Sequence, residues 1–327
     1  MTLRNKHLIA YATSMVALIL CQLLFYTQPF QRLSDFHTDV YYTLISQIIC
    51  MGAIPFLTLL ALNRGKVLPE LKLMRYKPPR DKRSCFLLAV GLMLLITPFT
   101  MTFNALTNLF FSIVGYKRSY PVGMIYLGAG DFFLMIFLTA LLPAIFEEFT
   151  HRGLLLSGLE NRGSELSAVV VSAMMFGLMH ENPAQLFYAF FGGLVFGVAV
   201  IKTDSIIPAM CAHFANNAVS VILDFSVQRQ NPFGVWYSKF FGAGDVLSVA
   251  ITVAVLGFSV YGVVKLLQYI SRKAPKPISE RKLFGVVTLD SFKPDGRATL
   301  KDNAFLIAVI VSEGLLSLSL LAWGIGR

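Results

Sequence analysis

Long apolar stretches separated by short polar loops dominate the chain. A helix needs about 20 apolar residues to cross the hydrocarbon core of a bilayer. The 166–201 region divides into two short spans around Asn182-Pro183, and Pro98 predicts a kink or a tilt in the third stretch. The pattern therefore predicts an all-α, polytopic membrane helix bundle with about eight or nine transmembrane helices. The candidate spans are residues 8–27, 41–62, 86–114, 132–158, 166–181, 184–201, 206–225, 246–270 and 304–323.

The composition agrees with a membrane protein. Hydrophobic residues make up 56% of the 327 residues and charged residues 14%, against about 25% in a soluble domain. A soluble chain of this size could not cover so much apolar surface, so soluble enzymes, nucleic-acid binders and disordered scaffolds are excluded. The first stretch lacks a small-residue cleavage site and is expected to remain as a signal anchor. The four cysteines show no CxxC spacing and are expected to be small buried hydrophobes.

The net charge of +10 follows from membrane topology. If the N-terminus is cytoplasmic, most of the 28 Lys and Arg residues fall on the cytoplasmic side, as membrane proteins prefer. The loops 63–85 and 271–303 are basic, and we expect them to contact anionic lipid headgroups and no nucleic acid. The expected location is a bacterial cell membrane. We divide the chain into residues 1–125, a catalytic core at 126–225, and residues 226–327 with the linker 271–303.

Polar side chains inside the spans gather between residues 147 and 217. With a rise of about 1.5 Å per residue, Glu147, His180 and Asn217 lie roughly 18, 21 and 17 Å from the cytoplasmic ends of three helices. A lone intramembrane His or Asn usually joins two helices by a hydrogen bond. Independent bonds of that kind have no reason to share one depth. The pattern therefore predicts a common polar chamber, and ionisable groups inside a membrane are functional candidates.

Spacing within each helix assigns possible roles. Glu148 and Arg152 are i,i+4 neighbours and can form an ion pair. Glu147 points about 100° away, which leaves it as a candidate general base. His213 and Asn217 are also i,i+4 and could donate hydrogen bonds to an oxyanion. Depth and spacing do not choose the base between Glu147 and Glu148.

Three further positions take ordinary interpretations. Gly177, three residues before His180, predicts a close approach of two helices. His151 is expected to face the loop side and receives no role. Glu313 is expected to make a hydrogen bond inside the bundle.

Three motifs resemble those of one protein family. The string from Glu147 to Gly153 resembles the EExxxR motif of the CPBP intramembrane proteases, which are also called the CAAX prenyl protease and bacteriocin-processing, or Abi-like, family. Phe176 to His180 resembles the FxxxH motif, and His213 to Asn217 the HxxxN motif. The similarity covers about residues 130–225 and leaves the outer spans without a motif.

The resemblance implies an intramembrane endopeptidase of the glutamic type, with no cofactor and no metal. Its substrate would be a membrane-embedded or lipidated peptide; neither the exact substrate nor the oligomeric state follows from the motifs. The site residues that it implies fall into three groups: Glu147 with His180 to activate water, His213 with Asn217 to hold the oxyanion, and Glu148 with Arg152 to position that group.

Other protease chemistries and other functions either stay open or do not fit the residues. Glu147 or Glu148 with His180 and His213 could hold zinc, which would make the protease metal-dependent. Gly128 to Asp131 spells the GxGD of aspartyl proteases, but an N-cap explains this aspartate and no Tyr-Asp partner exists. A non-catalytic immunity or scaffold protein that binds a peptide in the chamber is the alternative from another class. A transporter would call for inverted repeats, and none is found.

Overall fold

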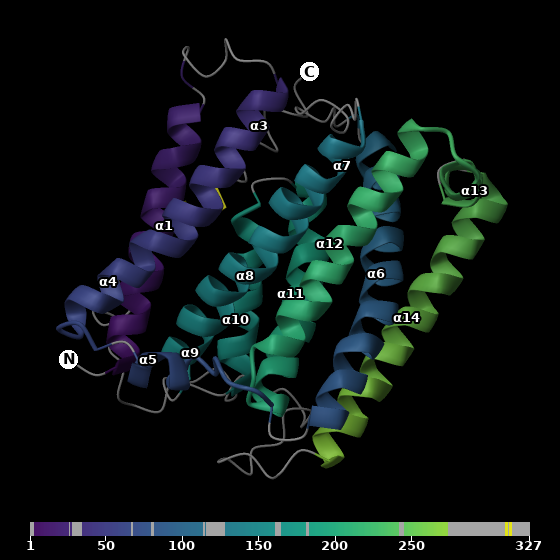
Figure 1. Cartoon of the computed structure of the whole chain (residues 1–327). Helices are drawn as coiled ribbons and strands as arrows, with labels where there is room; N and C mark the ends of the chain where they lie inside the picture. Colours follow the sequence, from purple (N-terminus) through teal and green to yellow (C-terminus); the bar gives the residue numbers. More distant parts are fainter. Residues whose placement is uncertain are drawn as a thin grey trace.

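The computed structural model describes residues 3–25, 27, 35–66, 68–79, 82–113, 115, 128–160, 165–180, 183–241, 245–273, 311–312 and 314–315. Its elements in these ranges are all helices (Figure 1). They are α1 (Leu3–Phe25), α3 (Asp35–Leu44), η1 (Ile45–Ala53), α4 (Ile54–Leu62), α5 (Leu68–Leu73), α6 (Lys82–Ile113), α7 (Ala129–Met135), η2 (Ile136–Leu141), α8 (Leu142–Glu148), η3 (Phe149–Leu156), α9 (Ser157–Leu159), α10 (Glu165–Leu178), α11 (Pro183–Thr203), α12 (Ile207–Gln228), α13 (Pro232–Phe241) and α14 (Val246–Lys273). Segments labelled η are π-helical.

The predicted all-α, polytopic bundle is confirmed. The predicted spans 166–181 and 206–225 coincide with α10, which is shorter than the other spans but apolar, and with α12. The ninth, 304–323, lies outside the described residues except for 311–312 and 314–315, and Glu313 is among those left out. The total of eight or nine spans therefore stays a prediction. Within the described part of the chain, six helices are long and apolar enough to cross a membrane: Asn5–Phe25, His37–Leu62, Ala89–Phe111, Ala129–Leu159, Gln185–Thr203 and Val246–Tyr269.

The loops at one end of the bundle touch one another. Lys6 Nζ donates a hydrogen bond to Asn63 Oδ1, and the Ile206 amide donates to the Arg75 carbonyl at 3.1 Å. The N-terminus, the loop after α4 and the turn before α12 thus share an end, while α7 and α13 lie at the other (Figure 1). These segments were expected on one side of the membrane, and their common end agrees with that expectation.

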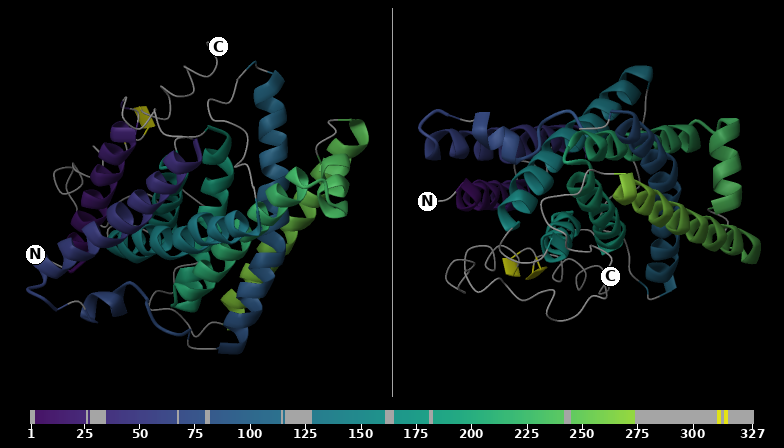
Figure 2. Two further views of the ribbon diagram at one scale, coloured as in Figure 1. Left: turned by 45° about the horizontal axis from the view of Figure 1, so that its top comes forward. Right: turned by 90° about the horizontal axis from the view of Figure 1, so that it is seen from below.

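The continuous helix α7–η2–α8–η3–α9 occupies the centre of the bundle. It contacts η1 and α1 on one side and α10 and α12 on others. The α10–α11 hairpin packs against it, and α6 lies beside α14 and against α12 (Figure 2). Several separate segments of the chain therefore surround this one helix.

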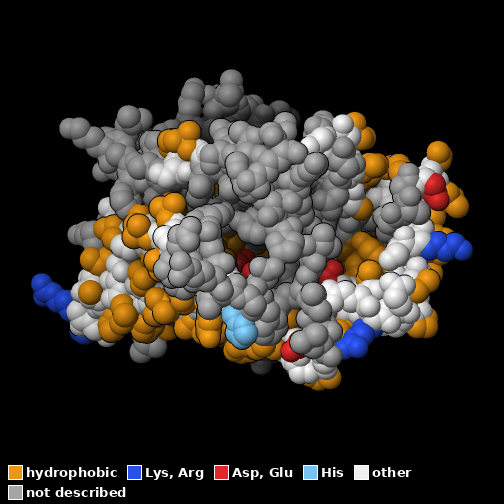
Figure 3. All heavy atoms as spheres, turned by 90° about the horizontal axis from the view of Figure 1, so that it is seen from above, with side chains coloured by type: hydrophobic (Ala, Val, Ile, Leu, Met, Phe, Trp, Pro, Cys, Tyr) orange, Lys and Arg blue, Asp and Glu red, His pale blue; other side chains and the backbone are white. Residues whose placement is uncertain are grey.

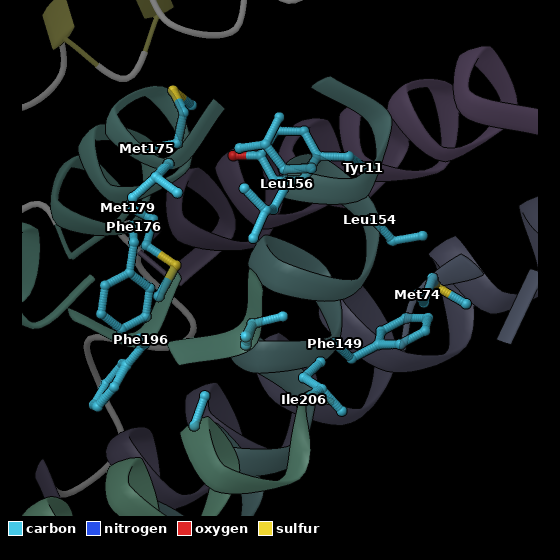
Figure 4. Close-up of a cluster of buried hydrophobic side chains, with 14 of the residues drawn as sticks. Tyr11, Met74, Phe149, Leu154, Leu156, Met175, Phe176, Met179, Phe196 and Ile206 are labelled. Atoms are coloured by element: carbon cyan, nitrogen blue, oxygen red, sulfur yellow. The ribbon is translucent and has the colours of Figure 1, made fainter. Parts of the chain in front are cut away.

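Close packing in the core depends on small residues and aromatic rings. Tyr11, Phe149, Phe176 and Phe196 belong to one buried cluster (Figure 4). A Cβ added to Gly177 would lie 2.7 Å from a backbone oxygen of α11. The close helix approach predicted at Gly177 is confirmed.

Large apolar side chains also cover the flanks of the bundle (Figure 3). A water-soluble monomer rarely exposes apolar patches of this extent, whereas a lipid-facing surface requires them. The expectation of buried cysteines is correct for Cys21 and Cys50 but wrong for Cys211, which lies on an outward face of α12. Side chains that are more than half exposed include Leu20, Leu57, Leu94, Phe133 and Phe258.

Candidate active site

Glu147 and Glu148 end the short α-helical segment α8, between the π-helical segments η2 and η3. A π-helical turn holds more residues than an α-helical turn, so it changes which side chains share a face. Such segments are rare and frequently occur at functional sites. The local backbone therefore marks this part of the central helix as unusual.

Glu148 and Arg152 form the predicted ion pair. Arg152 Nη1 donates to Glu148 Oε1 at 3.0 Å, and both side chains are fully buried. Arg152 Nη2 donates to the Gly193 carbonyl at 3.2 Å, and the guanidinium carbon lies 4.3 Å from the centre of the Phe176 ring. Contacts with α10 and α11 thus hold the arginine, which compensates the charge of Glu148.

His213 reaches both glutamates from α12. Its Nδ1 lies 2.9 Å from Glu148 Oε1, and its Nε2 lies 3.7 Å from Glu147 Oε2. Because a carboxylate paired with Arg152 accepts hydrogen bonds, we assign the proton to Nδ1. The second ring nitrogen therefore faces Glu147.

Glu147 stays outside the ion pair with Arg152, as the spacing predicted. Its Oε1 accepts a 2.9 Å hydrogen bond from Gln47 Nε2 in η1. Its Oε2 accepts none from the described residues and faces His213. One carboxylate oxygen is thus held in place, while the other is buried without a hydrogen-bond donor among the described residues.

His180 lies in the turn that follows α10. Its Nδ1 is 2.7 Å from the Phe176 carbonyl, which assigns the proton to Nδ1 and leaves Nε2 as an acceptor. The ring also packs edge-on against Phe176, with centroids 5.1 Å apart. The His213 ring packs against the same Phe176 ring, with centroids 5.6 Å apart, so the structure brings His180 and His213 to one aromatic neighbour.

Asn217 is part of a polar chain between three elements. Thr100 in α6 donates to Asn216 Oδ1, and Asn216 Nδ2 donates to Asn217 Oδ1 at 3.1 Å. Asn217 Nδ2 donates to the Thr139 carbonyl at 3.0 Å. The chain fixes the orientation of the Asn217 amide, and its NH₂ group keeps a second N–H for another acceptor.

Two expectations from the sequence are wrong in position. His151 does not face a loop: it is fully buried, and its ring packs between those of Tyr11 and Phe176. Asp131 is not the N-cap of its helix. Gly128 takes that place, and Asp131, three residues later, accepts a 3.1 Å hydrogen bond from the Gly128 amide. A helix-capping role for this carboxylate is retained.

The segment after α4 packs against one end of the central helix and contributes to a second cluster of buried polar side chains. His7 Nε2 lies 2.7 Å from Glu70 Oε2, and His7 Nδ1 lies 2.7 Å from Ser157 Oγ. All three side chains are fully buried. Burial, and then the charge of Glu148, raises the pKa of Tyr76 in the same loop. This loop is therefore part of the folded core at its end of the bundle.

Some of the loop's basic residues have protein partners. Arg75 pairs with Glu160 at 2.7 Å and with Asp204 at 3.2 Å, and Lys77 pairs with Asp204. These two cations neutralise acids of the protein, because the loop folds back onto the ends of α9 and α11.

The zinc-dependent alternative finds no support in the residues that the structure describes. They contain no group of three or more His, Cys, Asp or Glu side chains that could hold a metal ion. Glu148 already accepts hydrogen bonds from Arg152 and His213.

A family model described as Rce1-like, type II CAAX prenyl endopeptidase, matches residues 129–219. The match begins with α7 and ends within α12, so it includes both glutamates, His180, His213 and Asn217. Over these residues the chain is similar to that family. No curated protein and no solved structure matches the chain. The CAAX endopeptidase match leaves out η1, and therefore Gln47.

Sequence reasoning missed several partners of the site residues, among them Gln47 and the backbone carbonyls of Gly193 and Thr139. Gln47 is a polar residue within an apolar stretch, and this weak signal could have drawn attention to it. The Gly193 carbonyl that binds Arg152 could not be found from the sequence, because every residue carries a backbone carbonyl and only the folded geometry singles this one out.

Proposed function

We propose that the chain is an intramembrane endopeptidase of the glutamic type, which hydrolyses a peptide bond in a membrane-embedded or lipidated substrate. The match of residues 129–219 to the CAAX endopeptidase family model supports a protease. The observation that carries the mechanism is the different state of the two glutamates. Glu148 is bound by Arg152 and His213, whereas Glu147 keeps an oxygen that faces His213 Nε2 at 3.7 Å.

In the proposed mechanism, Glu147 is the general base. Together with His180, it activates the water that attacks the scissile carbonyl and takes up its proton; when the C–N bond of the tetrahedral intermediate breaks, this proton passes to the leaving amine. His213 and Asn217 stabilise the oxyanion. His213 can donate from Nε2 only when both ring nitrogens carry protons, and Glu148 accepts the bond from Nδ1. Glu148 and Arg152 thus position the oxyanion-binding imidazole.

We also propose a location and an orientation for this multi-pass protein. We place it in a bacterial cell membrane, and the excess of basic residues in alternate loops supports an N-terminus in the cytoplasm. Anionic lipid headgroups would contact the basic loops 63–85 and 271–303. Residues 126–225 would form the catalytic core, flanked by the N-terminal and C-terminal helices.

Cleavage by purified protein in detergent tests the proposal. The probe is an internally quenched peptide with a C-terminal CAAX sequence, prepared with and without its prenyl group. Wild-type protein should cleave it, and Glu147→Gln and His180→Ala should each lower the rate by at least about 100-fold, since general acid–base groups contribute about that much. Glu160→Gln is the matched control, because that carboxylate pairs with Arg75 at the end of the same central helix.

Three results would count against the mechanism. Wild-type rates in Glu147→Gln would remove the proposed base. Binding of the peptide without cleavage by the wild-type protein would favour a non-catalytic scaffold. Activity that a chelator removes and zinc restores would favour the metal-dependent version.

A further inference from the structure

Gln47 is buried beside the proposed base, although the two residues are 100 positions apart. It lies in η1, with 8% of its surface exposed. Its Nε2 donates to Glu147 Oε1 at 2.9 Å. A glutamine within an apolar span carries a desolvation cost, so its retention at this point calls for a physical reason.

We infer that Gln47 is a positioning residue for Glu147; this inference rests on the proposed function. Its amide stabilises the charged carboxylate by a hydrogen bond and fixes the rotamer of that side chain. With Oε1 held, Oε2 is directed toward His213 Nε2 at 3.7 Å. Gln47 therefore acts on the reaction through the base and does not touch the substrate.

The hydrogen bonding of the Gln47 side chain indicates that it serves as a donor to Glu147. Gln47 Oε1 is buried and accepts no hydrogen bond from the described residues. A glutamine that served only to join two helices would be expected to use its carbonyl as well. Here the only bond recorded for this side chain among the described residues goes to the carboxylate.

Neighbouring contacts hold η1 against the central helix on both sides of the base. Thr150 Oγ1 donates to the Met51 carbonyl at 3.1 Å. Gly52 packs so tightly that an added Cβ would lie 2.7 Å from the Phe146 ring. Since Phe146 and Thr150 flank Glu147 in sequence, packing sets the separation of the two helices at Gln47 and Glu147.

Two substitutions of Gln47 test the inference in the peptide-cleavage assay. Gln47→Met keeps a similar length and removes the donor. We expect kcat to fall about tenfold or more, as for the loss of a hydrogen bond to a charged group, with KM unchanged. The matched control is Gln22→Met, which replaces another buried glutamine, in α1. This control should keep the wild-type kcat.

Gln47→Glu tests the rate–pH profile, which would not change if Gln47 only filled space between the helices. A carboxyl group at this position can donate to Glu147 only when it is protonated, and two ionised carboxylates repel each other. The optimum of the rate–pH profile should therefore move to lower pH than in the wild type. Other titratable or charged groups near Glu147 are Glu148 of α8, His151 and Arg152 of η3, His180 after α10 and His213 of α12, and all five are unchanged in this variant.

The outcomes distinguish a failure of the positioning role of Gln47 from a failure of the proposed function. A wild-type kcat in Gln47→Met would overturn the positioning role, and so would a Gln47→Glu profile that superimposes on the wild-type profile. The Gln47→Glu profile compares rates within one preparation, so a lower yield of folded protein does not affect it. If the wild-type protein does not cleave, or Glu147→Gln cleaves normally, the proposed function itself fails.

Discussion

At the scale of single residues, the site depends on a buried cation. Arg152 is fully buried, contacts an aromatic face and binds both a carboxylate and a backbone carbonyl. The Glu148–Arg152 pair was predictable, because i,i+4 spacing brings two side chains together on one helix. The third member, His213, comes from a helix 65 residues away and depends on packing.

Removal of the cation should destabilise the protein strongly. Arg152→Met leaves the Glu148 carboxylate buried without its main partner, and we expect a loss of about 3–5 kcal/mol in the free energy of unfolding. Glu148→Gln in the same chain should restore part of this loss, because the uncompensated charge is then absent. Thermal unfolding in detergent of the two single variants and the double variant measures the coupling. Additive effects would contradict a direct charge interaction.

At the scale of elements, three π-helical segments and one tight hairpin shape the site. The segments η1, η2 and η3 lie on the two helices that carry Gln47 and the glutamates. A hydrophobic periodicity of 3.6 residues cannot predict them, because a π-helical turn holds more residues than an α-helical turn. The approach of α10 and α11 was predictable from Gly177, since only glycine leaves room for a neighbouring backbone.

Two glycines of the hairpin give a matched test of this packing. Gly177→Ala would place a Cβ 2.7 Å from the Leu186 carbonyl oxygen, and we expect a loss of about 1–3 kcal/mol in the free energy of unfolding. An added Cβ at Gly192 meets nothing within 4 Å, so Gly192→Ala should be neutral or stabilising by up to about 1 kcal/mol. Melting temperatures in the same detergent compare the two. Equal effects would mean that the close approach does not limit stability.

At the scale of the whole molecule, the described loops sort to two ends of one bundle. The hydrogen bonds between the N-terminal residues, the loop after α4 and the turn before α12 require these segments to share an end. Which end faces the cytoplasm depends on the distribution of basic residues, since the bundle itself is compatible with either orientation.

Cysteine labelling tests the orientation. Lys66→Cys lies in an exposed loop at the proposed cytoplasmic end, and Ser238→Cys is exposed on α13 at the other end. A membrane-impermeant maleimide should label Ser238→Cys in intact cells, and Lys66→Cys only after the membrane is permeabilised. The wild-type chain, with its native cysteines, supplies the background. The reverse pattern would place the N-terminus outside.

The sequence by itself determined the helical class and the positions of eight described spans or helices. These properties follow from local composition and from the fixed rise of a helix. Tertiary structure alone decided which faces of the helices meet. In a membrane protein, apolar residues face both lipid and core, so hydrophobicity does not reveal the neighbour of a given face. For this reason Gln47, the Gly193 carbonyl and the two contacts of His213 became known only from the packed bundle.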